Sequence, residues 1–289
     1  MAKEIKKKQV TTSMVNDIKR ILKDKYFNVW MSKFEISGID DYYTEQFILK
    51  RLYNNGQVVV FDLKGYGPVA TDYAVHSWGI NHRPIGIEPV DYEVQRLLPK
   101  QLTNGKDCVL GYINSSRSPI VDVVNMRVNR MADLYAAMFV NLQLNKIPFM
   151  VTSENVDMMN LIIDRIYSNE LAVFCNQDVA DMIKCFNTEA PYLIDKYWMQ
   201  ILNEESQLLS EIGIDCNTLN MNRITADQSN ANNMIIETIN DGYDYHLGYL
   251  CSKVNELFGT NWSIQTKHIE IISIHEEEGA APEGGQDNE

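Results

Sequence analysis

Four lysines stand close together near the beginning of the sequence and could bind an anion. The first ten residues contain Lys3, Lys6, Lys7 and Lys8 against a single acidic residue, with few apolar side chains to bury. This composition predicts a flexible basic arm over residues 1–12. Such an arm could hold phosphate groups through charge, and it could equally be a solubilising tail. The sequence leaves both alternatives open.

Amide side chains gather in a second segment, residues 214–234. Its sequence, IDCNTLNMNRITADQSNANNM, has no sustained hydrophobic period, which predicts a mobile loop rather than a packed element. Amide and hydroxyl groups form hydrogen bonds with phosphate without adding a strong charge. A loop of this length in a compact chain is usually functional or disordered.

Motifs for catalysis and for phosphate binding are absent from the sequence. It contains no GxxxxGK[ST], GxGxxG, HExxH or GxSxG pattern. The five histidines show no ligand spacing with cysteine, and no pair of carboxylates is marked out for acid–base chemistry. We therefore expect no catalytic residue, no metal site and no cofactor, and an enzyme is the disfavoured class.

Charge and cysteine content restrict the class of protein further. A formal net charge of −13 repels free nucleic acid, so any nucleic-acid contact must come from local basic groups or from a surface that does not adhere. The five cysteines are odd in number and form no CxxC, which predicts reduced thiols. No apolar run is long enough to cross a bilayer, and residues 1–10 lack the apolar region of a secretory signal, so we expect synthesis in a cytoplasm.

One long helix is predicted within residues 187–213. Thr188 can cap it, Pro191 suits its first turn and Gly213 ends it. Apolar residues recur at spacings of three and four and form one broad face. They are Leu193, Ile194, Tyr197, Trp198, Ile201, Leu202, Leu208, Leu209 and Ile212.

A second long helix is predicted over residues 119–146, which contain no glycine, and no proline after the first residue. At a rise of about 1.5 Å per residue it would span roughly 40 Å. Arg127 and Arg130 share one of its faces, with Asp133 nearby. They form either a solvated, internally paired flank or a contact between subunits.

The remaining segments predict an α+β fold. A helix is expected over residues 13–34, a short helix over 46–52, a buried strand over 58–61 and an irregular β-rich region over 69–113. A compact β-α-β-α insert should connect the two long helices. A further helix is expected over residues 234–258, weakened by Gly242 and Gly248, with a strand over 262–265. Residues 276–289 are acidic and glycine-rich, which is typical of disorder.

Four blocks of sequence together resemble one known family. They are FILKRLYNNGQVVVFD (residues 47–62), KIPFMVTSEN (146–155), FNTEAPYLIDKYWMQ (186–200) and KVNELFGTNW (253–262). Their order and spacing are similar, over roughly residues 26–265, to those of the upper-collar connector, or portal, proteins of small protein-primed tailed phages of Gram-positive bacteria.

The resemblance implies a portal fold that assembles as a dodecameric ring at one vertex of the capsid. Double-stranded DNA would be packaged and ejected through the ring. It further implies capsid, scaffold and lower-collar or tail proteins and a packaging ATPase as partners, with a structural RNA as an optional component and with no membrane. The protein would be in the host cytoplasm during assembly and then in the virion. The predicted regions are the arm (1–12), a wing with the N-terminal helix (13–118), stem helices (119–146 and 187–213), a clip (147–186), a channel loop (214–234), a wing or crown (235–275) and the acidic tail (276–289).

The resemblance also implies which residues face DNA. The family has two channel-facing lysines; Lys196 matches the second, whereas Asn187 occupies the position of the first, and Lys184 is the nearest lysine that could replace it. Lys3, Lys6, Lys7 and Lys8 would hold the nucleic-acid component of the packaging machinery. The channel loop would contribute Asn217, Asn220, Asn222, Arg223, Gln228, Ser229, Asn230, Asn232 and Asn233.

Two other classes remain open at this point. The first is a cytoplasmic helical structural or adaptor protein with no role in nucleic-acid binding, which a ring with an open bore would exclude. The second is an enzyme with an unrecognised site, which turnover of a nucleotide by the pure protein would favour.

Overall fold

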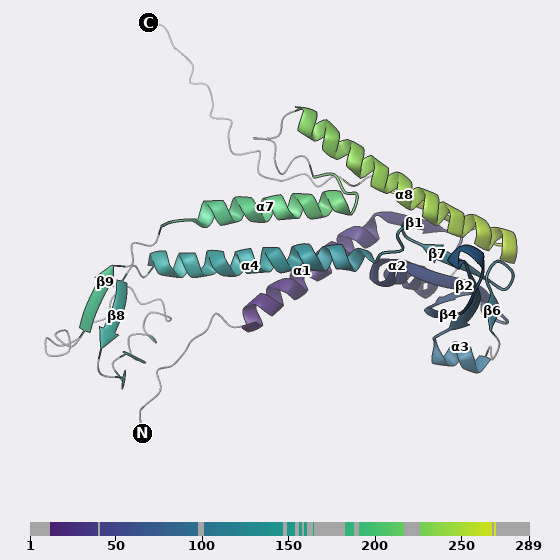
Figure 1. The fold of residues 1–289 in the computed structure, drawn as a ribbon, viewed down its shortest axis with the longest axis horizontal. Coiled ribbons are helices and arrows are strands. Elements are labelled where there is room, and N and C mark those ends of the chain that lie inside the picture. Colours follow the sequence, from purple (N-terminus) through teal and green to yellow (C-terminus); the bar gives the residue numbers. More distant parts are fainter. Residues whose placement is uncertain are drawn as a thin grey trace, which may run out of the picture. The chain divides into compact units, whose positions relative to one another are not determined.

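The protein's structure, a computed structural model, describes residues 12–39, 41–97, 101–146, 149–153, 156–157, 159–160, 164, 183–187, 191–216, 226–267 and 269. Unit 1 comprises Met1–Leu22 and Val128–Leu202, and unit 2 comprises Lys23–Arg127 and Asn203–Glu289. Three helices contribute residues to both units (Figure 1). They are α1 (Thr12–Ser32), α4 (Ile120–Lys146) and α7 (Ile194–Glu211).

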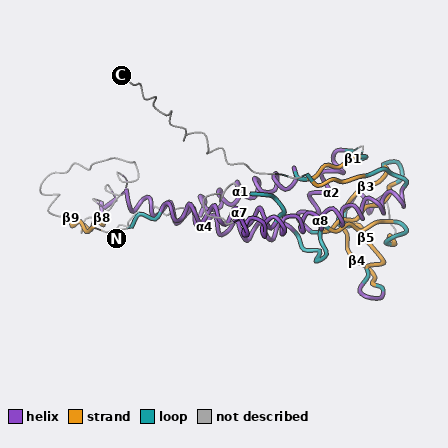
Figure 2. Tube along the Cα trace, turned by 90° about the horizontal axis from the view of Figure 1, so that it is seen from above, coloured by secondary structure: helices purple, strands orange, loops and turns teal. Residues whose placement is uncertain are grey.

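The described part of unit 2 contains three antiparallel sheets, and the β-rich character predicted for residues 69–113 is confirmed. Figure 2 shows strands of this unit beside the helix α8. In order across each sheet, the strands are β3 (Gly67–Thr71), β2 (Gln57–Leu63) and β7 (Cys108–Tyr112); β4 (Tyr73–Trp78), β5 (Pro84–Pro89) and β6 (Leu102–Thr103); and β1 (Phe34–Ser37) and β10 (Ser263–Thr266).

Strand β2 lies at the centre of the unit 2 core. Its residues Val58, Val59, Val60 and Phe61 are fully buried, which confirms the predicted buried strand. Because both faces of β2 are covered, its apolar residues form a continuous run rather than alternating with polar ones. One cluster of the core consists of Val59, Phe61, Leu63, Ile87, Val94, Leu102, Cys108 and Leu110.

Short elements connect these strands. α2 (Tyr42–Asn55) is longer than predicted, because Asp41 caps its start by accepting a hydrogen bond from the Thr44 backbone N–H at 2.8 Å. Gly56 ends the helix at φ 70°, in the left-handed region that favours glycine. The remaining short helices of the described residues are η1 (Ile80–His82) and α3 (Tyr92–Leu97).

Helix α8 (Ala226–Phe258) covers the sheet that contains β2 and β7 (Figure 1). It starts before the predicted position, so the prediction of a loop is wrong for residues 226–234. The predicted weakening at Gly242 and Gly248 does not interrupt the helix, since both glycines lie inside it with no atom near the place a Cβ would take. Gly111 of β7 has another role: a Cβ there would lie 2.6 Å from Leu250 Cδ2, so α8 approaches the sheet closely at this point.

Aromatic rings join α1, β1, α2 and α8 within unit 2. The Trp30 ring lies 4.7 Å from that of Phe34 and 5.3 Å from that of Tyr53, and the Phe34 ring lies 5.9 Å from that of Tyr243. Phe34 was expected at the end of the first helix. It instead begins β1, where it pairs with Thr266 of β10, and α1 therefore ends at Ser32.

The described part of unit 1 contains segments of α1, α4 and α7 together with a two-stranded antiparallel sheet. The helix predicted over residues 119–146 is confirmed by α4. The sheet consists of β8 (Phe149–Ser153), close to the predicted strand, and β9 (Ile183–Asn187), which the sequence did not predict. The rest of the predicted insert, a helix to Tyr167, a strand at residues 171–174 and a helix cap at Asn176, lies largely outside the described residues.

The helix predicted within residues 187–213, with Thr188 as its cap and Pro191 in its first turn, begins later than expected. Asn187 is the last residue of β9 and pairs with Phe149 of β8, so its backbone is extended. Proline disfavours helical geometry in the residue before it and lacks an N–H donor. Pro191 is followed by two further non-helical residues, and α7 begins at Ile194.

An added methyl group should have opposite effects on stability at Gly248 and at Gly111, two glycines of unit 2. Gly248→Ala should raise the free energy of unfolding by about 0.5–1 kcal/mol, because the site is open and alanine favours the helix. Gly111→Ala should lower it by about 1–3 kcal/mol, because the methyl group would collide with Leu250. Urea unfolding followed by circular dichroism measures both changes, and equal effects at the two sites would contradict this account of how α8 packs.

Candidate nucleic-acid channel

The predicted channel lysines lie on two neighbouring elements of unit 1. Lys196 lies in the first turn of α7, next to Asp195, and is exposed to solvent. Lys184 and Asn187 lie in β9, in register with Thr152 and Phe149 of β8. Residues 188–190 connect this strand to the part of the chain that leads into α7 and lie outside the described residues.

The predicted channel loop divides into two parts. Asn217, Asn220, Asn222 and Arg223 lie outside the described residues, as do the arm lysines Lys3, Lys6, Lys7 and Lys8. The other predicted residues have helical backbone in the first turns of α8, which corrects their assignment to a loop, and Asn233 is half-buried. They are Gln228, Ser229, Asn230, Asn232 and Asn233.

The N-terminal end of α7 is fixed to α4 by a buried amide within unit 1. Asn141 Nδ2 donates a hydrogen bond to the Pro191 carbonyl at 2.9 Å, and Asn141 Oδ1 accepts one from the Leu193 backbone N–H at 3.0 Å. Both hydrogen bonds satisfy backbone groups that precede the helix. The turn that carries Lys196 is thereby held against α4.

The C-terminal half of α7 is fixed to α4 by Arg127, within unit 2. Arg127 Nη1 donates hydrogen bonds to Glu204 Oε2 at 2.9 Å and to Gln207 Oε1 at 2.6 Å. Nη2 forms an ion pair with Glu211, to which Nε also donates at 3.2 Å. Arg127 and Glu204 are both buried, and these hydrogen bonds with Glu211 and Glu204 raise the pKa of the Arg127 guanidinium.

This Arg127 cluster corrects the prediction of a solvated flank for that residue. Arg127 points into a contact between two helices of the same chain, whereas Arg130 is exposed. The acceptors were not predicted because they lie about 80 positions further along the chain. Their spacing was nevertheless a usable signal, since residues three and four apart on a helix share a face. The acceptors are Glu204, Gln207 and Glu211.

Lys33 holds the end of α7, also within unit 2. Its fully buried ammonium donates to the carbonyls of Ile212 at 3.0 Å and Gly213 at 2.8 Å, and also to Asn240 Oδ1 of α8. A cation near the C-terminal carbonyls of a helix is favourable. Burial nevertheless lowers the pKa of Lys33 to about 7, and the charge of Asp244 acts in the opposite direction.

Apolar side chains remain exposed on the part of the helix pair that belongs to unit 1. In the unit 2 segments of α4 and α7, Val124, Leu208 and Leu209 are fully buried. The Trp198 side chain on α7 is 46% exposed, although the sequence pattern assigned it to the apolar face. Other apolar residues of α4 and of the segment that leads into α7 are also exposed. The exposed set in unit 1 is Val140 42%, Leu142 49%, Leu144 42%, Tyr192 61% and Trp198 46%.

Neither a cluster of metal ligands nor a membrane-spanning helix occurs among the described residues. Among the described residues, no three side chains of histidine, cysteine, aspartate or glutamate are grouped to hold a metal ion. Within the same residues, no helix has the length and apolar character required to span a membrane.

Comparison with known proteins identifies the family. The family model described as Phage Connector (GP10) matches residues 88–271, which is more than half of the 289-residue chain. The chain therefore belongs to the phage connector family, and the resemblance found in the sequence is confirmed. Its function is that of a phage portal, or connector, protein in DNA packaging, which the comparisons favour over a cytoplasmic adaptor. Proteins of this class are virion components that form oligomeric rings and connect capsid and tail.

The chain is also similar to two solved portal structures. One is from the portal and tail of native bacteriophage P68, at 12% sequence identity and a TM-score of 0.47, with 87% of this chain and 86% of that chain covered. The other is an HK97 family phage portal protein from Corynebacterium diphtheriae, at 10% identity and a TM-score of 0.44, with 89% of this chain and 95% of that chain covered.

Replacement of Arg127 tests the contact between α4 and α7. Arg127→Met should lower the free energy of unfolding by about 3 kcal/mol or more, because it removes the buried ion pair between Arg127 and Glu204. The matched control is Arg96→Gln, which removes an exposed pair with Glu93 and should change stability by less than about 0.5 kcal/mol. Chemical unfolding measures both variants. Equal, small losses would contradict a structural role for the buried guanidinium.

The lowered pKa of Lys33 predicts a pH dependence of stability. Between about pH 7 and its ordinary value of 10.5, the unfolded chain holds a proton that the folded chain has lost. The contribution of Lys33 to the free energy of unfolding should therefore rise with pH in this window, by at most about 1.4 kcal/mol per pH unit. Urea unfolding between pH 6.5 and 9 should give a more positive slope of the free energy against pH in the parent chain and in Lys25→Met, which alters an exposed lysine of α1, than in Lys33→Met. The same slope in all three proteins would exclude Lys33 as its source.

Proposed function

We propose that the chain assembles into a closed ring of twelve subunits, in which α4 and α7 form the stem around a channel for double-stranded DNA. The main support is the incomplete burial of the stem helices within one chain, above all at Trp198. Apolar surface of this kind favours association, and a heterologous contact between identical copies closes into a ring when its rotation permits. Neighbouring subunits would complete the burial that one subunit leaves unfinished.

The channel surface in this proposal combines overall negative charge with few cations. Lys196 is exposed at the start of α7 and would face the bore, with Lys184 as the candidate for the second lysine position. Asn217, Asn220, Asn222 and Arg223, together with the polar residues at the start of α8, would contact the DNA backbone through hydrogen bonds. An acidic surface with a sparse ring of positive charge would let DNA slide, because few counterions are released at any one contact.

The regions of the chain receive the roles that the family resemblance implies. Residues 13–118 and 235–275 would form the wing and crown, which contact capsid and scaffold proteins. Residues 147–186 would form the clip, which faces the lower collar or tail protein and the packaging ATPase, with a structural RNA held by the arm. The ATPase would supply the energy of packaging, so the connector itself would need no catalytic site or cofactor. The finished assembly would occupy the portal vertex of the virion after assembly in the host cytoplasm.

A charged residue at the exposed stem position tests the assembly. Trp198→Glu should weaken association by at least tenfold per contact, because it places a carboxylate in an apolar interface. Sedimentation velocity should then show smaller species than for the parent protein, with the circular dichroism spectrum unchanged. The control, Tyr66→Glu, adds the same charge at an exposed position in the turn between β2 and β3 and should leave the oligomer intact. Equal effects would mean that added charge, rather than the stem contact, separates the subunits.

The basic arm has its own test, which separates a phosphate-binding arm from a solubilising tail. Replacement of Lys3, Lys6, Lys7 and Lys8 by alanine should remove a salt dependence of nucleic-acid binding with a logarithmic slope of roughly −3 to −4, since about four counterions would no longer be released. Filter binding of RNA and of DNA across a salt series measures the slope, and the oligomer should persist. Unchanged affinity and slope in the variant would support the tail.

A further inference from the structure

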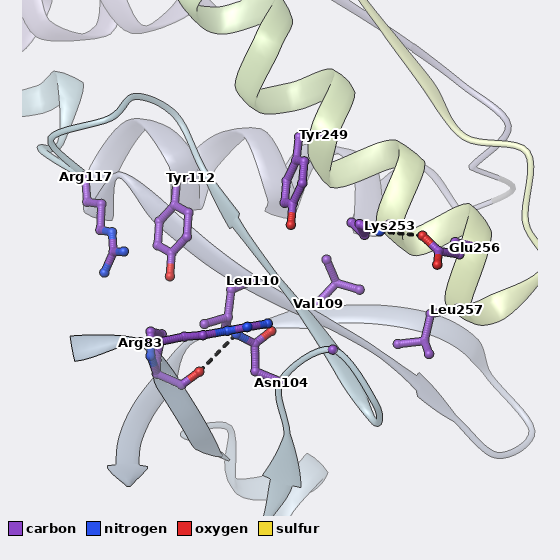
Figure 3. Close-up of a pocket in the computed structure, with 12 residues that line it drawn as sticks. Arg83, Asn104, Val109, Leu110, Tyr112, Arg117, Tyr249, Lys253, Glu256 and Leu257 are labelled. Carbon is purple, nitrogen blue, oxygen red and sulfur yellow. Dashed lines mark hydrogen bonds and ion pairs between the residues drawn. The ribbon is translucent and has the colours of Figure 1, made fainter. Parts of the chain in front are cut away.

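A cavity of about 550 Å³ lies in unit 2, and the residues that line it include none of those predicted to contact DNA. Figure 3 shows its walls: Tyr249 and Lys253 come from α8, Tyr112 from the end of β7 and Arg117 from the loop that precedes α4. Arg83, just before β5, lies across the opposite side. The cavity thus brings together positive charge and aromatic rings from four separate parts of the sequence.

Two of the three cations in this cavity have no carboxylate partner among the described residues. Lys253 donates to Glu256 at 2.5 Å, and the two charges offset each other. Among the described residues, no aspartate or glutamate forms an ion pair with Arg83 or with Arg117, and the Arg117 guanidinium lies 4.4 Å from the centre of the Tyr112 ring. In a chain with a net charge of −13, two such guanidinium groups at one cavity are available to an external anion.

Backbone strain coincides with both arginines. Arg117 has φ 58°, and His82, immediately before Arg83, has φ 52°. This left-handed region is unfavourable for residues other than glycine and costs about 1 kcal/mol or more for each residue. The loop around Arg117 is also closely packed, since a Cβ on Gly56 would lie 2.6 Å from the Arg117 carbonyl oxygen. The loops therefore hold the arginines in place at a cost in stability.

The character of the cavity favours a peptide carboxylate over a nucleic acid. Apolar side chains such as Leu110 and Leu257 form part of its lining, and Tyr112 and Tyr249 add aromatic surface. Arginine forks match carboxylates in geometry, and apolar walls suit small side chains between them. A long polyanion would in addition be repelled by the acidic chain as a whole.

We propose that this cavity binds the acidic segment of residues 276–289, EEEGAAPEGGQDNE, of the same chain. The segment has six acidic residues and no basic residue, and Ala280, Ala281 and Pro282 lie between Glu278 and Glu283. Its carboxylates complement Arg83 and Arg117, and the Ala-Ala-Pro stretch complements the apolar and aromatic walls. The bound segment would cover this face of unit 2.

The segment can reach the cavity from its own chain. Thr266, in the last strand before it, donates a hydrogen bond from its hydroxyl to Asp244 of α8. Tyr249 and Lys253 lie five and nine residues further along this helix, which corresponds to about 8 and 14 Å. Residues 267–275 can span up to roughly 30 Å when extended, so the connection has length to spare.

Fluorescence anisotropy with a labelled peptide of residues 276–289 tests the proposal. The acceptor is the full-length chain in which Glu276, Glu277, Glu278 and Glu283 are replaced by glutamine, so that its own segment does not compete. We expect saturable binding that falls at least tenfold in affinity when Arg83→Gln and Arg117→Gln are added. The control Arg96→Gln removes an exposed arginine outside the cavity and should have no effect.

Each outcome of this experiment decides the proposal. The proposal is overturned if no binding is seen up to about 1 mM peptide. It is also overturned if a peptide with glutamine at every acidic position binds equally well, or if Arg96→Gln lowers the affinity as much as Arg83→Gln with Arg117→Gln. Displacement of the peptide by a single-stranded oligonucleotide at lower concentration would overturn it in favour of a nucleic-acid site. A photo-cross-linking residue at Tyr249 then tests the source of the segment. Linkage within one copy leaves a single-chain band on a denaturing gel, as we expect, and linkage only between copies, which gives a two-chain band, would overturn the proposal.

Discussion

The pairing of α4 with α7 depends on one buried guanidinium. Arg127 satisfies Glu204, Gln207 and Glu211 together, and these three acceptors lie on one face of α7 because they are three and four residues apart. A buried cation with several acceptors adds little net stability but strongly disfavours any other alignment of the two helices, since a shift would leave charges unpaired. The register of α4 against α7 is thereby fixed within a single chain.

Lys33 fixes the chain that directly follows α7. Its ammonium donates hydrogen bonds to the carbonyls of Ile212 and Gly213 and to Asn240 of α8. The chain before residues 217–225 and the helix after them are therefore linked through one side chain. In the proposed channel, residues 217–225 would contact the duplex while the chain on both sides of them stays in place. The rigid parts in this account are ion-paired and buried, and the proposed DNA contacts are polar and weakly charged.

The sequence predicted the elements whose signals are local. The helix over residues 119–146 was found because no glycine or proline interrupts it, and β2 because its apolar run is continuous. The start of α7 was missed because pairing of β9 with β8 overrode a good capping residue, and the start of α8 because an asparagine-rich stretch has little apolar period. Arg127 and Lys33 were missed as structural centres because their partners are far away in sequence. Asn217 and the arm lysines remain predictions.

The central claim is that identical subunits complete the burial of the stem helices around an open bore. Negative-stain electron microscopy of the purified protein tests it most directly, because end-on views separate a closed ring from every other assembly. The account predicts rings of uniform diameter with a central hole filled by stain. Particles of the size of the 33.2 kDa monomer at micromolar concentration, or compact oligomers without a hole, would contradict it.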